Sequence, residues 1–273
     1  MFRDRAATLR EQSMLGQGDR EMFAEGRAPC VVAFHGFGGT AAELRPVLDA
    51  VAAAGFAVDA ALLAGHGTRV EALQDATFDA WVEGARARVV AAAAAHGRVV
   101  LLGFSLGSLV AMEIAAGAPE GVVGLVAMGN ALTLRAHTSV PFAVWQRLTR
   151  RPPPDAYLMK PIAGDLVDPS GMGMLVTYDR HPLRAALEVY RAGPRVRALV
   201  PRITCPTLVL HGKRDRVCSW KNATWLASHV GARDVSVRIF EKSAHVIACD
   251  GEREDVAREV VAFVRRLGDP RER

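Results

Sequence analysis

The sequence lacks the features that mark membrane-spanning and zinc-binding proteins. No run of apolar residues reaches the roughly 18 that a transmembrane helix needs. The four cysteines lie far apart in the chain and form no Cys-x-x-Cys pair. We therefore expect no bound metal, no cofactor and reduced thiols at Cys30, Cys205, Cys218 and Cys249.

The chain also lacks a concentrated charge of one sign. Its net charge of +5 comes largely from scattered arginines. The closest approach to a basic cluster, residues 265–266 with Arg271 and Arg273, is interrupted by acidic residues. Because no basic stripe is interleaved with aromatic residues, we expect no nucleic acid partner. The first residues lead into no apolar segment of the kind a secretory signal contains, so the expected location is the cytoplasm.

What the sequence does contain is enough apolar material for a large core. Half of the 273 residues are hydrophobic and 23% are charged, which is ordinary for a soluble globular protein. This length suits one large α/β domain with room for an insertion, or two small domains.

The most informative stretch is residues 99–118. A run of apolar residues leads into the pattern Gly103-x-Ser105-x-Gly107, and small and apolar residues follow. This arrangement predicts a buried strand, a sharp turn and a helix. It matches the nucleophile elbow, in which a serine sits in a strained bend with its hydroxyl exposed. Glycine on either side of the serine lets neighbouring backbone pass where a Cβ atom would clash.

Short apolar runs alternate with helical patterns along much of the chain. Thr40 and Glu43 have the spacing of a capping box that opens a helix, and Thr77 can cap another. Most of the apolar runs are continuous, which favours strands covered on both faces. Strands separated by helices predict a mostly parallel, doubly wound sheet with helices on both faces. The predicted strands lie near residues 22–24, 30–34, 56–63, 99–103, 122–128, 207–212 and 235–240.

The pattern changes about halfway along the chain. Residues 130–200 hold all three tyrosines, and the segments 152–154 and 171–173 are rich in proline and glycine respectively. No clear strand pattern is present, so we expect short helices joined by proline-broken loops. We interpret residues 130–200 as a mainly helical cap inserted into a core of residues 1–129 and 201–273. The cap would supply an adaptable apolar wall of methionine and aromatic side chains.

Two residues can complete a nucleophilic site around Ser105. A serine hydroxyl is a poor nucleophile near neutral pH, so a base must accept its proton and a third group must orient that base. Asp215 follows the predicted strand 207–212, and His245 follows the predicted strand 235–240. Because the carboxyl ends of parallel strands meet at one edge of a sheet, the three side chains are expected to converge. The chain order serine, aspartate, histidine is the one described for an elbow of this kind.

Several motifs occur in order along residues 28–267: His-Gly-Phe-Gly-Gly at 35–39, Gly-His-Gly at 65–67, Gly-Phe-Ser-Leu-Gly at 103–107, His-Gly-x-x-Asp at 211–215 and Ser-Ala-His-Val-Ile at 243–247. Together they resemble the α/β-hydrolase superfamily, and most closely its bacterial carboxylesterase and monoacylglycerol lipase branch. The sequence His245-Val-Ile followed by Asp250-Gly-Glu-Arg-Glu carries the closest likeness. One departure is Ser108, which stands where the family often has a second glycine and could tighten packing of the helix. The cap is the other, because it shows little likeness to members of the family.

The resemblance implies an α/β-hydrolase fold and a role for each residue of the site. Ser105 would be the nucleophile, His245 the base and then the acid, and Asp215 the group that orients the histidine. The backbone N–H groups of Phe37 and Leu106 would form an oxyanion hole, which stabilises charge that develops in the transition state.

The implied activity is hydrolysis of a carboxylic ester, without a metal, through an acyl-enzyme intermediate. Short- to medium-chain acyl esters or monoacylglycerols would fit an apolar cap, and the oligomeric state stays open. An amidase, thioesterase, acyltransferase or perhydrolase could use the same residues, and a non-catalytic ligand-binding protein could use the same scaffold. Epoxide and haloalkane hydrolases are disfavoured, because those relatives carry aspartate where Ser105 stands. The candidate substrate-binding residues lie in the cap: Trp145, Met172, Met174 and Tyr178.

Other polar residues near these motifs have a structural interpretation. We expect His35 and His66 to bond loop backbone and His211 to be structural as well. Asp250 could orient the catalytic histidine in place of Asp215, but its position ahead of the terminal helix is better explained as a helix cap.

Overall fold

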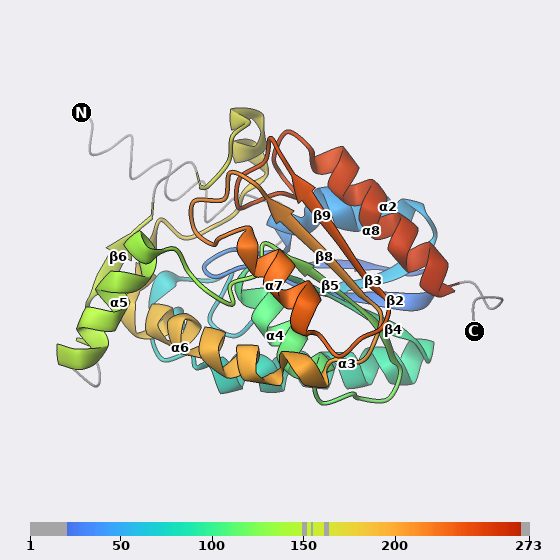
Figure 1. The fold of residues 1–273 in the computed structure, drawn as a ribbon, viewed down its shortest axis with the longest axis horizontal. Helices are drawn as coiled ribbons and strands as arrows, with labels where there is room; N and C mark the ends of the chain where they lie inside the picture. The colour runs from blue at the N-terminus through green and yellow to red at the C-terminus, as the bar shows by residue number, and fades with distance from the viewer. Residues whose placement is uncertain (1–20, 149–151, 154, 161–163, 269–273) are drawn as a thin grey trace.

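A seven-stranded sheet organises the protein, in a computed structural model that describes residues 21–148, 152–153, 155–160 and 164–268 (Figure 1). The strand order is β1-β3-β2-β4-β5-β8-β9, and every neighbouring pair is parallel except β1 with β3. The strands are β1 (Met22–Ala24), β2 (Arg27–Phe34), β3 (Phe56–Ala60), β4 (Val99–Phe104), β5 (Val122–Met128), β8 (Thr207–Gly212) and β9 (Val235–Phe240). The predicted mostly parallel sheet is therefore confirmed.

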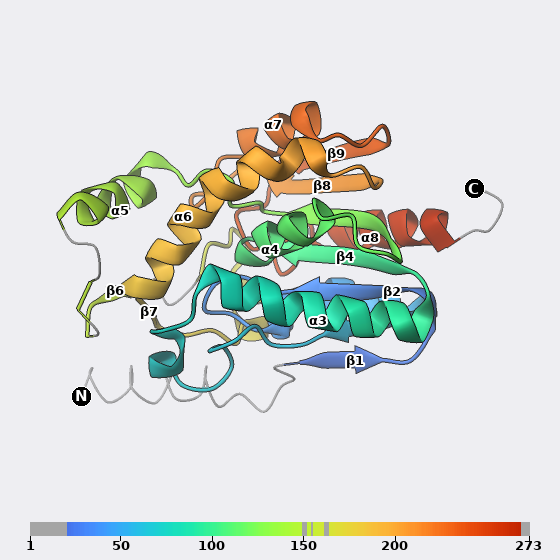
Figure 2. The same cartoon turned by 90° about the horizontal axis from the view of Figure 1, so that it is seen from below.

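Helices cover both faces of this sheet (Figures 1 and 2). On one face, α2 (Arg45–Ala53) and α8 (Arg253–Gly268) pack against each other. On the other face lie α3 (Phe78–His96), α4 (Leu106–Ala115) and α7 (Lys221–His229), and α6 (Leu183–Leu199) packs against α3 and α4. Short 3-10 turns complete the set: η1 (Ala41–Leu44), η2 (Val70–Leu73), η3 (Pro169–Met174) and η4 (Val200–Arg202). Among the described residues, no helix combines the length and the apolar character that crossing a membrane would require.

The strands alternate their side chains between two hydrophobic clusters, one on each face. Val31 and Val100 belong to the cluster under α2 and α8, whereas Val32 and Leu101 belong to the cluster under α3 and α4. Because both clusters exclude water, each strand can be apolar at every position. This double coverage explains why the strands appear in the sequence as continuous apolar runs.

The segment between β5 and β8 differs from its predicted structure in two ways. It contains α5 (Ala136–Leu148), but also β6 (Tyr157–Met159) and β7 (Arg180–Pro182), which pair as a separate antiparallel sheet. The expectation of no strands was wrong here, because three-residue strands paired across twenty residues leave no periodic pattern. In addition, α6 buries Ala185, Val189, Ala192 and Val196 in the hydrophobic cluster under α3 and α4. Residues 183–200 therefore share the core of the α/β layers.

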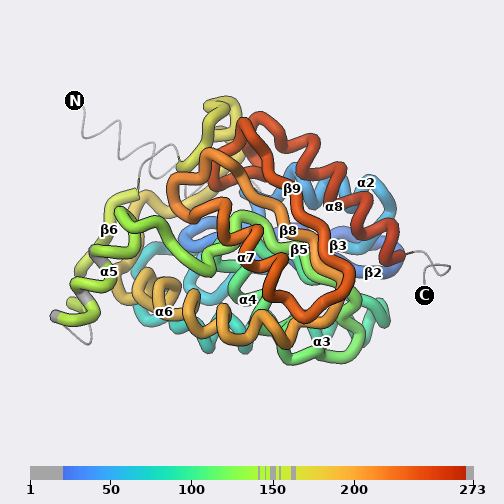
Figure 3. Tube along the Cα trace, in the orientation of Figure 1, coloured from blue at the N-terminus to red at the C-terminus, as the bar shows by residue number. Residues whose placement is uncertain are grey.

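The elements α5, β6 and β7 of the insertion lie beyond the carboxyl ends of the parallel strands. The arrowheads of β2 and β8 point toward the end of the molecule where α5, β6 and β7 lie (Figure 2). The tube view follows the same segment as it leaves the sheet after β5 and returns through α6 (Figure 3). This is the end of the sheet at which the loops after β2, β4, β8 and β9 gather.

Two glycines allow the chain to turn sharply between β4 and α4. A Cβ atom at Gly103 would lie 2.2 Å from the carbonyl oxygen of Gly107. A Cβ atom at Gly107 would lie 2.0 Å from the carbonyl oxygen of Phe34 on the neighbouring strand. Real Cβ atoms do not approach backbone this closely, so glycine at 103 lets α4 pack against β4, and glycine at 107 lets α4 pack against β2.

Gly107→Ala is expected to lower the free energy of unfolding by about 3 kcal/mol or more, because backbone on two elements would have to move apart. Gly84→Ala is the matched control, since Gly84 lies inside α3 with no atom within 4 Å of the added methyl group. There alanine should stabilise the helix by about 0.5–1 kcal/mol. Urea denaturation of both variants measures the difference, and equal stabilities would contradict the close approach.

Candidate active site

Ser105 occupies a strained backbone position at the turn between β4 and α4. Its φ of 53° and ψ of −114° lie outside the regions that non-glycine residues prefer, at a cost of about 1–3 kcal/mol. The backbone N–H of Ser105 donates to the carbonyl of Met128, at 3.0 Å. The hydroxyl of Ser108 donates to the carbonyl of Ser105, at 2.6 Å. Ser108, the departure from the family pattern, thus helps to fasten the turn.

Three side chains from separate loops make contact in series at this turn. His245 Nε2 lies 3.0 Å from Ser105 Oγ, and His245 Nδ1 lies 2.7 Å from Asp215 Oδ2. His245 is 7% exposed and Asp215 is fully buried, whereas Ser105 keeps partial access to solvent. With the imidazole proton on Nδ1, the ring donates to Asp215 and accepts from the serine hydroxyl. The arrangement can therefore draw a proton from Ser105.

The carboxylate of Asp215 is held by groups on both of its oxygens. Oδ1 accepts from the backbone N–H groups of Val217, at 2.8 Å, and Cys218, at 2.7 Å. Oδ2 faces His245 and also lies 2.9 Å from His211 Nε2. Burial alone would raise the pKa of Asp215, but the charge of His245 and hydrogen bonds from both histidines outweigh it. The pKa of Asp215 is therefore well below its ordinary value, and the group stays ionised.

The pKa of His245 shifts in the opposite direction. Burial alone would lower it, but the charge of Asp215 and its hydrogen bond raise it more, and the carboxylates of Asp165 and Glu43 add to the effect. The net pKa lies above 6.5 because the imidazolium is better stabilised than the neutral ring. The ring is thereby made a stronger proton acceptor for Ser105.

Two backbone N–H groups predicted to form an oxyanion hole have no hydrogen-bond acceptor among the described residues. Leu106 opens α4, where the first N–H groups have no acceptor within the helix. Phe37 lies in the loop after β2, and neither its N–H nor that of Leu106 finds an acceptor within the described residues. The adjacent N–H of Gly36 instead donates to the carboxylate of Glu43. This contact holds the loop by its neighbouring N–H and leaves the Phe37 N–H without an acceptor among the described residues.

Glu43 plays a different part from the one its spacing predicts. The Thr40 hydroxyl does accept from the N–H of Ala42, at 3.3 Å, but the turn it caps is the 3-10 helix η1. The Glu43 side chain turns away from Thr40 and toward Gly36. Burial raises the pKa of Glu43, although the charge of Lys160 and the Gly36 N–H oppose this shift. The capping-box interpretation was therefore wrong for Glu43, because its carboxylate accepts from the N–H of Gly36 in the preceding loop and not from Thr40.

His35 and His66 bond loop backbone, as expected. His35 Nδ1 lies 2.9 Å from the Gly36 carbonyl, and His35 Nε2 accepts from the N–H of Leu63, at 3.1 Å. Burial lowers the pKa of His35 to about 4, so its ring stays neutral. His66 Nδ1 lies 3.2 Å from the carbonyl of Leu63 and 3.1 Å from that of Ala64. The His35 ring thus fastens the loop after β3 to the loop after β2, and the His66 ring bonds within the loop after β3.

Asp250 neither orients His245 nor caps α8 through its side chain. It is fully buried and accepts from four backbone N–H groups: those of Val167, Asp168, Ala244 and Gly251. The preference against an orienting role for Asp250 agrees with this, but the helix-cap interpretation was wrong, because this carboxylate ties the histidine loop to residues 167–168 of the inserted segment. The sequence gives no signal for that pairing, since the partners are backbone groups about eighty residues away.

The residues predicted to bind substrate lie in different environments. Met172 is 43% exposed, and Met174 is partly buried against the cluster under α2 and α8. Tyr178 is 2% exposed and its hydroxyl donates to the carbonyl of Gly65, at 2.9 Å. Tyr178 therefore supports the loop after β3, and its burial leaves little surface for contact with a ligand. Trp145 falls within the bounds of α5, but its side chain lies outside the described part of the structure.

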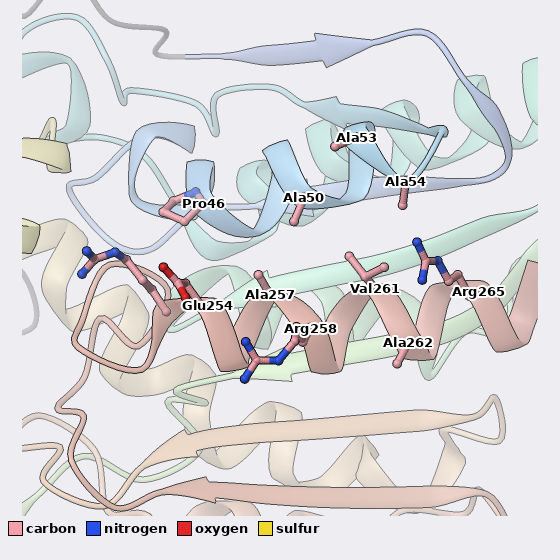
Figure 4. Close-up of a pocket in the computed structure, with 11 residues that line it drawn as sticks. Pro46, Ala50, Ala53, Ala54, Glu254, Ala257, Arg258, Val261, Ala262 and Arg265 are labelled. Atoms are coloured by element: carbon pink, nitrogen blue, oxygen red, sulfur yellow. The ribbon is translucent and has the colours of Figure 1, made fainter.

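Two further features bear on whether a metal ion or a second ligand could bind. Asp215, Cys218 and His245 each bring one potential metal-binding atom within 4.8 Å of the others. Asp215 and His245 are bonded to each other, and burial raises the pKa of the Cys218 thiol, which opposes metal binding. A groove of about 740 Å³ lies between α2 and α8, where Ala50 faces Ala257 (Figure 4). None of its lining residues belongs to the site around Ser105.

The chain is similar to several known proteins. Residues 26–252 match the Hydrolase_4 family model, described as serine aminopeptidase, S33. The thermostable monoacylglycerol lipase of Bacillus sp. (strain H-257) is 26% identical over 242 residues, 89% of this chain and 92% of that protein. A structure described for the metagenome-derived lipolytic enzymes LipS and LipT superposes with a TM-score of 0.82 at 23% identity, over 92% of this chain and 98% of its own. The monoacylglycerol lipase of Paleococcus ferrophilus gives a TM-score of 0.71 at 22% identity, over 90% and 99%. The two structures establish the shared fold.

Asp215→Asn is expected to lower the pKa of His245 by about 1–3 pH units, because burial then acts without the opposing carboxylate. Titration of the His245 ring resonances by NMR measures this pKa, which should exceed 6.5 in the unmodified protein. Asp79→Asn removes an exposed carboxylate on α3 and should leave the titration unchanged. A His245 pKa that does not respond to Asp215→Asn would refute the coupling.

Proposed function

The chain belongs to the Hydrolase_4 family (serine aminopeptidase, S33), and on this basis we propose that it is a serine hydrolase that cleaves carboxylic esters. The observation that carries the proposal is the unbroken series of contacts from Ser105 through His245 to Asp215. A protein that only binds ligands has no need of a nucleophile, a base and an orienting carboxylate in contact.

In the proposed reaction, Ser105 Oγ attacks the acyl carbonyl while its proton passes to His245 Nε2. The carbonyl oxygen, now negative, accepts hydrogen bonds from the N–H groups of Phe37 and Leu106, each worth about 3 kcal/mol of barrier. The tetrahedral intermediate then expels the alcohol, which leaves with the proton from His245. Water repeats the sequence on the acyl-enzyme, and the products are the carboxylic acid and free Ser105. Asp215 stays ionised throughout and stabilises the imidazolium.

The proposed substrates are short- to medium-chain acyl esters or monoacylglycerols. The lipase relatives act, by their names, on monoacylglycerols. The inserted segment contains methionine and aromatic residues, and it lies at the end of the sheet toward which the parallel strands point (Figure 2). We take residues 130–182 as the cap, with Met172, Met174 and Trp145 as its candidate contacts to the acyl chain. The four cysteines are unpaired, which fits a reducing compartment such as the cytoplasm.

Ser105→Ala is expected to lower kcat for p-nitrophenyl butyrate by at least about 10⁴-fold, since no other group can form the acyl-enzyme. It should also abolish labelling by a fluorophosphonate probe. Ser228→Ala, an exposed serine on α7, serves as the control and should retain full activity and labelling. Labelling that persists in Ser105→Ala, or a folded wild-type protein that is neither labelled nor active, would sink the proposal.

A matched set of acyl compounds separates ester hydrolysis from the other reactions this site could perform. We expect kcat/KM to be higher for p-nitrophenyl and monoacylglycerol esters of medium chain length than for the corresponding p-nitroanilides and thioesters. Adding a primary alcohol tests acyl transfer, because a transferase would form the new ester in preference to the free acid. Faster turnover of the anilide or the thioester would assign the site to that class instead.

A further inference from the structure

Asp165, in the inserted segment, contacts both loops that carry the catalytic histidine and aspartate. Its Oδ2 accepts from the backbone N–H of His245, at 3.2 Å, and from that of Arg216, at 2.8 Å. Its backbone carbonyl accepts from the N–H of Val246, at 3.2 Å. The side chain of Asp165 is 9% exposed, so these contacts are made largely out of water. One residue thus bridges the loop after β8 and the loop after β9.

Arg216 completes the environment of this carboxylate. Its Nε donates to Asp165 Oδ1, at 2.5 Å, while the arginine side chain stays 69% exposed. Because the arginine is largely in solvent, water screens its charge far more than that of the carboxylate. Asp165 therefore retains a negative field on its buried side, where His245 lies.

The contact between the two segments is reciprocal. Asp250, from the histidine loop, accepts from the N–H groups of Val167 and Asp168, at 3.0 and 2.8 Å. Farther along, a Cβ atom on Gly171 would lie 1.9 Å from the carbonyl oxygen of Cys249. Residues 165–171 thus pack closely against the histidine loop and exchange hydrogen bonds with it in both directions.

The charged groups that face His245 come from three elements. Asp215 contacts its ring, and the carboxylates of Asp165 and Glu43 both favour its protonated form. Arg216 stands against Asp165, and Lys160 stands opposite Glu43. Of the two carboxylates other than Asp215, only Asp165 is bonded to the backbone of His245 itself.

We propose that Asp165 is a positioning residue for the hydrolytic reaction. It fixes the His245 loop against the Asp215 loop, and its negative charge stabilises the imidazolium that forms when Ser105 gives up its proton. The proposal rests on the proposed function for its chemistry. It also links the proposed cap to the catalytic base, because Asp165 lies in the inserted segment and is bonded to the backbone of His245.

The test compares Asp165→Asn with the wild-type enzyme in pH profiles of kcat/KM for p-nitrophenyl butyrate. An anion that faces His245 raises its pKa, so removing the charge should move the acidic limb to lower pH, by about half a unit to one unit. At the pH optimum, kcat should fall about tenfold with KM little changed, because the variant misplaces the base without altering contacts to substrate. Asp165→Glu, which keeps the charge, should restore the position of the acidic limb.

Asp168→Asn is the matched control. It removes the same charge three residues farther along, from a partly exposed side chain whose hydrogen bonds go to Ser170 and Arg253 and to neither catalytic loop. Its pH profile should coincide with that of the wild type. If Asp165→Asn does not fold, the double variant Asp165→Asn with Arg216→Gln, in which no arginine loses its partner, carries the same expected shift.

An acidic limb in Asp165→Asn, or in the double variant that replaces it, that coincides with the wild-type profile would overturn the proposal, even if stability or total activity falls. That result would assign Asp165 a purely structural role. The wild-type arm keeps this outcome separate from failure of the proposed function, because a wild-type protein without esterase activity or fluorophosphonate labelling would contradict the latter alone.

Discussion

The contact between the imidazole of His245 and the buried carboxylate of Asp215 is the interaction on which the rest of the site depends. A carboxylate removed from water is costly, and here the cost is offset by two backbone N–H groups and two histidines around Asp215. Once ionised, Asp215 fixes the tautomer and orientation of His245 and raises its pKa. Ser105 is then within 3.0 Å of a nitrogen that can accept its proton. Without the carboxylate, burial would work against protonation of the ring and the serine would stay an ordinary alcohol.

The fold brings these groups together at one edge of a mostly parallel sheet. The parallel strands β2, β3, β4, β5, β8 and β9 all end at the same side, so loops more than a hundred residues apart meet there, and α4 starts directly after the serine. Glycine at 103 and 107 permits the close crossing, and the strained backbone of Ser105 is held by bonds to Met128 and Ser108. The inserted segment then adds polar contacts to the loops through Thr177, whose hydroxyl donates to the Gly38 carbonyl, and through Asp165. Scaffold and insertion together hold the site, rather than the scaffold alone.

Much of this arrangement follows from the sequence, and what does not follow has a physical reason. Continuous apolar runs and glycine spacing are local signals, so they predict the sheet, the elbow and the loops that carry Asp215 and His245. The short strands β6 and β7, the burial of Tyr178 and the roles of Glu43, Asp165 and Asp250 depend on partners far away in the chain. A carboxylate that accepts from backbone N–H groups does not require any particular side chain on the donor residues, so the contact produces no sequence pattern. Such residues become visible only when the loops are placed side by side.

A structure of the protein after reaction with a phosphonate ester would test the central claim most directly. Such an adduct imitates the tetrahedral intermediate, with its phosphorus bonded to the nucleophile. The account predicts a bond from Ser105 Oγ to phosphorus and a phosphoryl oxygen within about 3 Å of the N–H groups of Phe37 and Leu106. His245 Nε2 should lie against the ester oxygen, with Nδ1 still bonded to Asp215. Modification of another residue, or a phosphoryl oxygen that points away from both N–H groups, would contradict it.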